Sequence, residues 1–231
     1  MKPLFYKKPV LLNIKDHKEF TYSPVTDYSF TENSNSVYAL VSEFLLLCKE
    51  YPVVFVKDKS DKYTPIVLLS TKKDDNSFIV KNGAWDAQYI PAYIRRYPFI
   101  FANNKADDSE LMLAIDEEYK GFSNKKSGKK LFNKDGTHSK VISDALKFSS
   151  AFHSESIMTE KFCKTLDELD LFIESNFSSQ KKGITLDGFF TINKEKFSNL
   201  DASTLEKLHK QGYVEAIVYH FVSLTSIDNL R

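Results

Sequence analysis

The segment from Gly83 to Phe99, GAWDAQYIPAYIRRYPF, concentrates the side chains of this sequence that are best suited to recognition. It holds the only tryptophan of the chain, three tyrosines and two adjacent arginines. A guanidinium group binds carboxylates or phosphates through paired hydrogen bonds and stacks on aromatic rings. Tryptophan, tyrosine and arginine also dominate the hot spots of protein interfaces. We therefore expect a binding element made of Trp85, Tyr89, Tyr93, Arg95, Arg96 and Tyr97.

The same composition is equally typical of a packed corner of the core. In that alternative the aromatic rings fill the interior, and Arg95 and Arg96 pair with acids such as Asp116. Because proline is tolerated only in the first turn of a helix, a short helix is expected to begin just before Pro91 and to end before Pro98. The sequence leaves the binding surface and the packed corner open as interpretations.

An enzyme is the second class of function that the residues allow. His17, in NIKDHKEF, stands next to acids that can raise the basicity of an imidazole, which a general base requires. Asp116, at the end of a predicted strand, is one candidate partner, because strand-end carboxylates are a frequent place for acid–base chemistry. Asp86 is the other candidate. His220 lies in an apolar run and is expected to be a hydrogen-bonded core histidine. No motif typical of a zinc, nucleotide or flavin site is present, so the sequence implies no cofactor.

Composition limits the classes of partner. The 231 residues carry 32 Lys and Arg against 31 Asp and Glu, a net charge of +1, which disfavours nucleic acid and anionic lipid. The basic run KKSGKKLF, residues 125–132, is the one stretch that could attract an acidic partner. The apolar runs are too short for a signal peptide or a membrane span, and the two cysteines lack metal or disulfide spacing. We expect a cytoplasmic protein with reduced, buried cysteines.

In the first half of the chain, several short runs are typical of β-strands. VVFVK and YTPIVLLST flank the charged turn DKSDK and predict a hairpin. NSFIVKNG predicts a third strand that ends at an Asn82–Gly83 turn, and FIFA and ELMLAID predict two more. Before them, residues 36–52 carry apolar side chains at helical spacing, with Ser36 as a cap and Pro52 as a stop, and predict a helix.

The second half looks more helical. HSKVISDALKFSSAF and TEKFCKTLDELDLFIESNF have helical spacing, GFFTI predicts a strand, and DASTLEKLHKQG predicts a helix that Asp201 caps and Gly212 closes. YVEAIVYHFVSL is interpreted as a last strand. The expected fold is α+β, with a mixed or mainly antiparallel sheet in the first half and helices concentrated in the C-terminal half. We expect a single domain over 1–231, with a subdivision near residues 140–150 as the alternative.

Several of these stretches, taken in order, resemble one bacterial protein family. They are EF…YPVVF, NSFIVKNGAWDAQYIPAYIRRYPF, AID, GKKLF…DG, GFFTI and LHKQGYVEAIVYHFVSL. On these stretches, the sequence resembles the SapC family from about Val10 to the C-terminus. The most specific stretch is Trp85 with residues 89–99. The resemblance implies a protein associated with surface layers or secretion, whose partner is a surface-layer or type I-secreted polypeptide. The peptide-transporter permease of the same name is a different protein, because no membrane span occurs here.

A second, weaker resemblance bears on the enzyme alternative. WDAQYIPA, residues 85–92, is similar to a stretch of the lysine acyltransferases that modify toxins exported by type I systems. Those enzymes also carry an early histidine, which His17 would match. Here Gln88 stands where the acid of that pattern is expected, and an amide does not stabilise a charged imidazole. The resemblance implies an acyl- or other group-transferase that modifies an exported protein, with His17 as general base and Asp86 or Asp116 as its partner.

Overall fold

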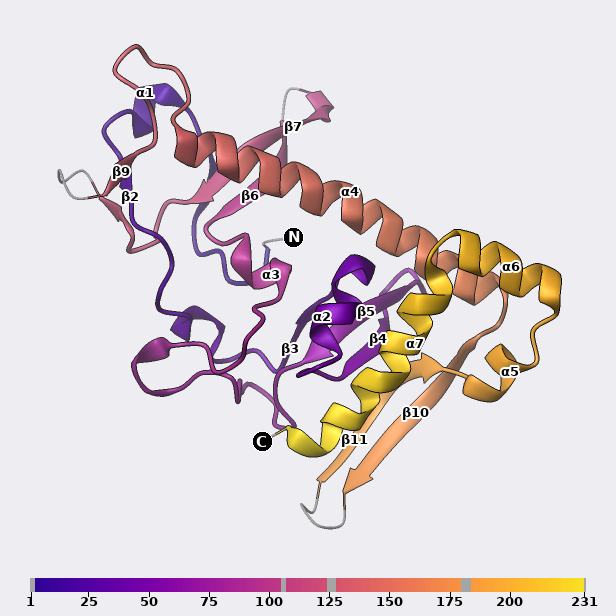
Figure 1. The fold of residues 1–231 in the computed structure, drawn as a ribbon. Helices are drawn as coiled ribbons and strands as arrows, with labels where there is room; N and C mark the ends of the chain where they lie inside the picture. The colour runs from indigo at the N-terminus through magenta and orange to yellow at the C-terminus, as the bar shows by residue number, and fades with distance from the viewer. Residues whose placement is uncertain (1–2, 105–106, 124–127, 180–183, 231) are drawn as a thin grey trace.

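The computed structural model describes residues 3–104, 107–123, 128–179 and 184–230 (Figure 1). The helices are α1 (Ile14–His17), α2 (Phe44–Leu47), α3 (Ala92–Arg95), α4 (Lys140–Glu168), α5 (Lys194–Ser198), α6 (Ala202–Lys210) and α7 (Tyr213–Ser223). The strands are β1 (Pro9–Leu11), β2 (Thr21–Tyr22), β3 (Ser36–Tyr38), β4 (Val53–Lys57), β5 (Tyr63–Leu68), β6 (Phe99–Asn104), β7 (Asp107–Asp116), β8 (Phe122–Ser123), β9 (Lys129–Lys130), β10 (Phe172–Ser179) and β11 (Ile184–Ile192). The fold is α+β with antiparallel sheets and with the longer helices in the C-terminal half, as the sequence predicts.

The larger sheet has the order β10-β11-β4-β5-β3, and every neighbouring pair is antiparallel. The β4–β5 hairpin confirms the one predicted from VVFVK and YTPIVLLST. The sheet, α2, α7 and the second half of α4 enclose the larger hydrophobic core, in which Phe44, Tyr51, Phe55 and Phe162 are fully buried.

Two smaller sheets form the other end of the molecule. One has the order β1-β7-β6 and the other β8-β2-β9. Phe99, Ile115 and Leu131 form a second core there with Ile142 of α4. The long helix α4 therefore contributes to both cores, and Figure 1 shows it running along the molecule from the β6–β7 end to α6.

The helix predicted over residues 36–52 is wrong in its first half. The chain forms strand β3 at Ser36–Tyr38, a 3-10 turn at Val41–Glu43 and only one α-helical turn in α2. β3 pairs with β5, and this tertiary pairing prevails over the local helical spacing. The carboxylate of Glu43 accepts a hydrogen bond from the backbone N–H of Leu40 and so fixes the start of the helical turn after the strand.

Three other predictions need correction. YVEAIVYHFVSL is helix α7, because a long continuous apolar run fits a buried helix as well as a strand. Residues 172–177, predicted as helical, belong to strand β10; Asp170, with a left-handed φ of 51°, stands between α4 and that strand. NSFIVKNG forms only an isolated bridge between Ile79 and Trp85, although the turn at Asn82–Gly83 is present with positive φ at both residues.

Other predicted elements are confirmed. Strands β6 and β7 include FIFA and ELMLAID, and GFFTI is the end of β11. Helix α6 has Asp201 as its N-cap, with the side chain accepting from the backbone of Thr204, and Gly212 follows with a φ of +72°.

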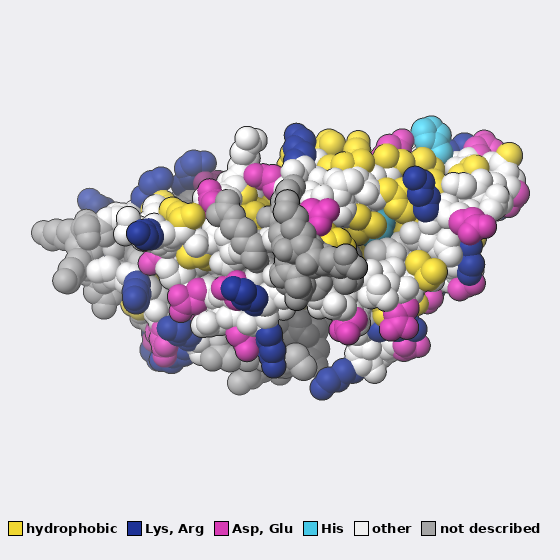
Figure 2. Space-filling view, turned by 90° about the horizontal axis from the view of Figure 1, so that it is seen from below, with side chains coloured by type: hydrophobic (Ala, Val, Ile, Leu, Met, Phe, Trp, Pro, Cys, Tyr) yellow, Lys and Arg dark blue, Asp and Glu magenta, His cyan; other side chains and the backbone are white. Residues whose placement is uncertain are grey.

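On the face that Figure 2 shows, Lys and Arg are interspersed with Asp and Glu, and hydrophobic side chains gather on one half of it. This mixture agrees with the balanced charge of the sequence. Cys48 and Cys163 are free and buried, and burial raises the pKa of the Cys163 thiol to about 12. Within the described ranges, no helix combines the length and the apolar character needed to cross a bilayer.

Candidate functional site

The start of α3 is fixed by a buried carboxylate. Glu43 is 5% exposed, and its Oε1 atom accepts hydrogen bonds from the backbone N–H of Ala92 (2.7 Å) and the hydroxyl of Tyr89 (2.7 Å). Pro91 precedes the helix, where its missing N–H is no loss. Burial raises the pKa of Glu43 even though these hydrogen bonds oppose the shift. The helix therefore begins where a side chain far away in the sequence holds its first N–H group.

Residues Gly83–Ile90, which we call the anchoring half of the segment, are tied into the larger core. The indole N–H of Trp85 donates to the hydroxyl of Tyr51 (2.8 Å), and that hydroxyl donates to the carbonyl of Tyr89. The indole ring also stacks on Phe78, with centroids 5.8 Å apart. Because its polar atoms have intramolecular partners, Trp85 serves packing here.

Residues Ala92–Phe99, which we call the cavity half, contain the two arginines. Arg95 is tethered: its Nε donates to the carbonyl of Ile90 (2.8 Å) and its Nη2 to the hydroxyl of Tyr89 (2.8 Å). The same Nη2 lies 3.9 Å from Glu43. The side chain remains 40% exposed, so part of the guanidinium group is available to a ligand.

Arg96 is held in a different way. Its guanidinium carbon lies 3.8 Å from the ring centroid of Tyr93 and 4.7 Å from that of Phe152 on α4, so the group is sandwiched between two rings. Its Nε atom is buried and has no hydrogen-bond partner. Among the described residues, no carboxylate forms an ion pair with it. Arg96 is thus a positioned cation without a counterion among the residues whose side chains the structure describes.

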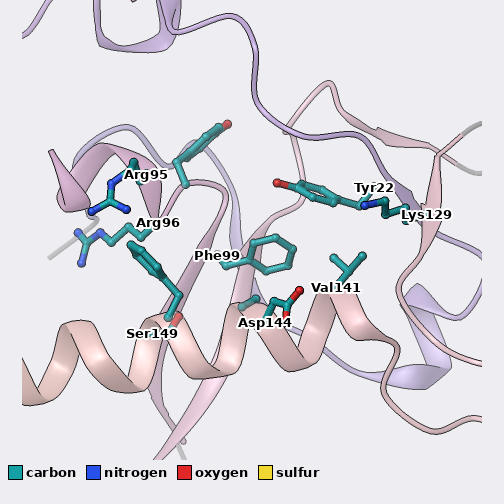
Figure 3. Close-up of a pocket in the computed structure, with 11 residues that line it drawn as sticks. Tyr22, Arg95, Arg96, Phe99, Lys129, Val141, Asp144 and Ser149 are labelled. Atoms are coloured by element: carbon teal, nitrogen blue, oxygen red, sulfur yellow. The ribbon is translucent and has the colours of Figure 1, made fainter. Parts of the chain in front are cut away.

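A cavity of about 280 Å³ opens beside the arginines (Figure 3). It lies between α3 and β6 on one side and the first half of α4 on the other. The residues that line it include Tyr22, Arg95, Arg96, Tyr97, Phe99, Lys129, Val141, Asp144, Ala145, Phe148 and Ser149. Figure 3 shows Arg95 and Arg96 at one end, Lys129 at the other and Phe99 between them. A smaller cavity of about 200 Å³ lies beyond Arg96 and Ser149, which line both.

Tyr97 and Asp116 come together, but in a structural role. The hydroxyl of Tyr97 donates to Asp116 Oδ2 (3.1 Å), and the backbone N–H groups of Lys7 and Lys8 donate to the same carboxylate (2.9 and 2.7 Å). Asp116 is fully buried, and burial together with the neighbouring carboxylate raises the pKa of Tyr97. Asp116 therefore ties the N-terminal segment to the end of β7. Asp116, one of the acids that the packed-corner interpretation offers to the arginines, does not pair with them in the described contacts; Arg95 lies 3.9 Å from Glu43 instead.

The structure does not bring the three candidate catalytic residues together. His17 is 2% exposed; its Nδ1 contacts the carbonyl of Asn13 (3.0 Å), and its Nε2 has no hydrogen-bond partner. The nearest acid is Glu117, whose Oε1 lies 4.0 Å from Nε2. Asp116 is occupied by its own hydrogen bonds, and Asp86 lies on the exposed loop beside Trp85. In the described part of the chain, no three His, Cys, Asp or Glu side chains gather as ligands for a metal ion.

Phe148 and Phe152 were not singled out from the sequence, and Glu43 and Lys129 were included only within longer stretches, EF…YPVVF of the family resemblance and the basic run 125–132. Phe148 and Phe152 stand four residues apart on α4, which places them on one face of the helix. Lys129 belongs to the basic run 125–132, which the sequence marks as able to attract an acidic partner. The role of Glu43 depends on contacts with residues 46 and 49 positions away, and local pattern gives no signal for it.

Comparison with known proteins gives one match. The sequence model of the SapC family matches residues 12–230 of the 231-residue chain. No curated protein and no solved structure shows a significant similarity. The matched range contains both halves of the segment and all residues that line the cavity. The chain belongs to the SapC family.

Proposed function

We propose that this protein binds a polypeptide segment that carries a carboxylate group, and that it does so in the cavity beside Arg95 and Arg96. One observation carries the proposal: the guanidinium group of Arg96 is fixed between Tyr93 and Phe152 with a buried, unpartnered Nε and without a counterion among the described residues. Most arginines that serve packing pair with an acid or with backbone carbonyls. A cation that the fold holds in place and leaves unpaired favours an anionic ligand.

The balance of charge in the cavity supports the same ligand. Arg95, Arg96 and Lys129 line it, and Asp144 is the only acid among the lining residues. The cavity therefore has three cations against one anion, in a chain whose net charge is only +1. Arginine binds a carboxylate through paired hydrogen bonds, and stacking on the rings reduces the entropy lost when the ligand arrives.

We base the proposed source of the polypeptide on the family resemblance. The resemblance described above implies association with surface layers and secretion, so we propose a surface-layer or secreted polypeptide as the ligand. We place its capture in the cytoplasm, before export, with the protein acting as an accessory factor.

A group-transferase is the second proposal, and the unpartnered Nε2 of His17 is the observation in its favour. A general base needs an acceptor nitrogen that is not already engaged. At 2% exposure, however, His17 reaches a substrate only if the N-terminal segment moves. The cavity beside the arginines needs no such movement, so binding is the better supported function.

The test is affinity capture of the tagged protein from its own cells, followed by intact-mass measurement of what co-purifies. We expect a stoichiometric, unmodified polypeptide that is lost with Arg96→Ala and reduced with Arg95→Ala. Lys147→Ala is the matched control, since it removes a positive charge from α4 outside the cavity. His17→Ala should leave capture unchanged.

Two outcomes would contradict the binding proposal. Capture that is the same for Arg96→Ala and Lys147→Ala would show that the cavity does not hold the partner. A partner with an acyl-sized mass increment that disappears with His17→Ala, while capture persists, would instead support the transferase.

A further inference from the structure

The cavity has positive charge at both of its ends, and this separates two binding positions. Arg95 and Arg96 stand at one end, beside α3, and Lys129 of β9 stands at the other (Figure 3). Lys129 forms no ion pair with another described residue. We infer that the ligand carries two acidic residues, one for each end, separated by an apolar residue. This inference rests on the proposed function, because it specifies the ligand of the same cavity.

The spacing of the two acids follows from α4, which forms one wall. The lining residues of this helix run from Val141 to Ser149, eight positions, which is about 12 Å at a rise of 1.5 Å per residue. An extended polypeptide advances about 3.3 Å per residue, so residues i and i+4 are about 13 Å apart. Acids at i and i+4 of an extended segment therefore match the two ends of the cavity.

The middle of the cavity accepts an apolar side chain. In an extended segment, residues i, i+2 and i+4 point to the same side. Between the two cationic ends lies the ring of Phe99 (Figure 3), and Ala145, halfway between Val141 and Ser149 on α4, also lines the cavity. An apolar residue at i+2 would be buried against these side chains. The ligand is thus a segment of the form acid–x–apolar–x–acid.

Asp144 adds discrimination at the middle position. It lines the cavity on the α4 side and is paired with Lys140, one turn earlier on the helix (3.2 Å). A third carboxylate at i+2 would lie next to this acid and be repelled. A continuous acidic run should therefore bind less well than two spaced acids, although it carries more negative charge.

The two ends should not contribute equally. Arg96 is sandwiched and partly desolvated, whereas Lys129 is an exposed residue with a flexible side chain. An ammonium group binds a carboxylate as a point charge, and an exposed pair of this kind contributes little compared with a positioned guanidinium group. The first acid provides most of the affinity, and the second acid provides the selectivity for spacing.

The experiment is calorimetric titration of the full-length protein with capped peptides of identical composition. The spaced peptide is acetyl-Ser-Glu-Ser-Leu-Ser-Glu-Ser-amide, and its isomer is acetyl-Ser-Glu-Glu-Leu-Ser-Ser-Ser-amide. The spaced motif reads the same in both chain directions, so the orientation of the ligand does not affect the result. We expect the spaced peptide to bind about threefold more tightly than the isomer, in keeping with an exposed ion pair at Lys129.

The variants assign this difference to the two ends. With Lys129→Ala, the affinities of the two peptides should become equal, while Lys147→Ala should preserve the difference. With Arg96→Ala, both peptides should lose binding. Circular dichroism confirms that each variant is folded.

The inference is overturned if both peptides bind the wild-type protein equally, if neither binds, or if Lys129→Ala leaves the preference intact. If those results occur while the cellular partner is still lost with Arg96→Ala, the proposed function stands and only the spacing is wrong. If capture is insensitive to Arg96→Ala, the proposed function itself fails.

Discussion

The two halves of the segment from Gly83 to Phe99 contain similar residue types, but their polar side chains differ in whether they have hydrogen-bond partners within the protein. In the anchoring half, Trp85, Tyr51 and the carbonyl of Tyr89 form a closed chain of hydrogen bonds. In the cavity half, Arg96 is positioned as firmly but keeps a buried Nε without a partner. The comparison shows that richness in tryptophan, tyrosine and arginine does not by itself identify a binding surface. A polar group that the fold positions and does not pair is the more informative sign.

Glu43 joins the two halves, so its removal should have the largest effect. Glu43→Ala leaves the N–H groups of Ala92 and Leu40 and the hydroxyl of Tyr89 without their acceptor. We expect the free energy of unfolding to fall by about 3 kcal/mol or more, because each unpaired buried donor is costly. Urea unfolding followed by circular dichroism measures this.

Glu43→Gln is the control for that prediction. It keeps the size of the side chain and one acceptor oxygen, and should cost less than the alanine variant. Equal losses for the two variants would mean that the charge of Glu43, and not its acceptor geometry, holds α3 in place.

His220 extends the comparison to a residue whose two ring nitrogens are both paired. Its Nε2 accepts from the backbone N–H of Ile192 (3.1 Å), its Nδ1 contacts the carbonyl of Val53 (2.9 Å), and burial lowers its pKa to about 4. Between pH 4 and 6.5 the unfolded chain binds a proton here that the folded chain does not. Stability should therefore be complete above pH 6.5 and fall by about 3 kcal/mol as the pH decreases to 4.

The measurement is the pH dependence of unfolding for the wild-type protein and for His220→Gln. The variant should lose this part of the pH dependence. Glu43 contributes a pH dependence of the opposite sign. Its pKa is raised in the folded state, so just above the ordinary pKa of a glutamate the folded chain binds more protons than the unfolded chain, and stability falls as the pH rises. The difference between the two proteins isolates His220, and an identical pH dependence would contradict the assignment.

Tyr51→Phe should affect stability less than removal of Glu43 or protonation of His220. It is the most direct test of the difference between the anchoring half and the cavity half. It removes the hydroxyl that joins Trp85 to Tyr89, at a cost of about 1–3 kcal/mol, and should leave capture of the partner unchanged.

Arg96→Ala should do the reverse. Capture should be lost, and the free energy of unfolding should change by about 1 kcal/mol or less, because the lost ring contacts are offset by removal of an unpaired buried donor. If either variant affected both properties strongly, the two halves would not be separate.

The fold could be predicted from the sequence where local signals agreed with tertiary contacts. The β4–β5 hairpin, α6 with its Asp201 cap, and the class of the fold are such cases. Helix α7 could not be told from a strand, because it is apolar on most of its surface and therefore lacks a clear period. The helix predicted over 36–52 failed because β3 pairs with β5, a contact between residues about 30 positions apart.

Only some residues of the candidate site were predictable from the sequence, and their roles were not. Arg95 and Arg96 were identified by type, and both line the cavity. Trp85 belongs to the same sequence stretch but packs against Phe78 and Tyr51 and is not among the residues that line the cavity. The difference arises from partners elsewhere in the chain, above all Glu43 and Phe152, and a linear pattern does not show which partner each residue will find.

The position of Trp85 has a practical consequence for spectroscopy. It is the only indole of the chain, and it belongs to the anchoring half, stacked on Phe78 and bonded to Tyr51. Its emission will therefore report the loss of the larger core on unfolding, and it will stay unchanged when a peptide enters the cavity. Tryptophan fluorescence thus reports whether the larger core is folded, independently of whether a peptide occupies the cavity.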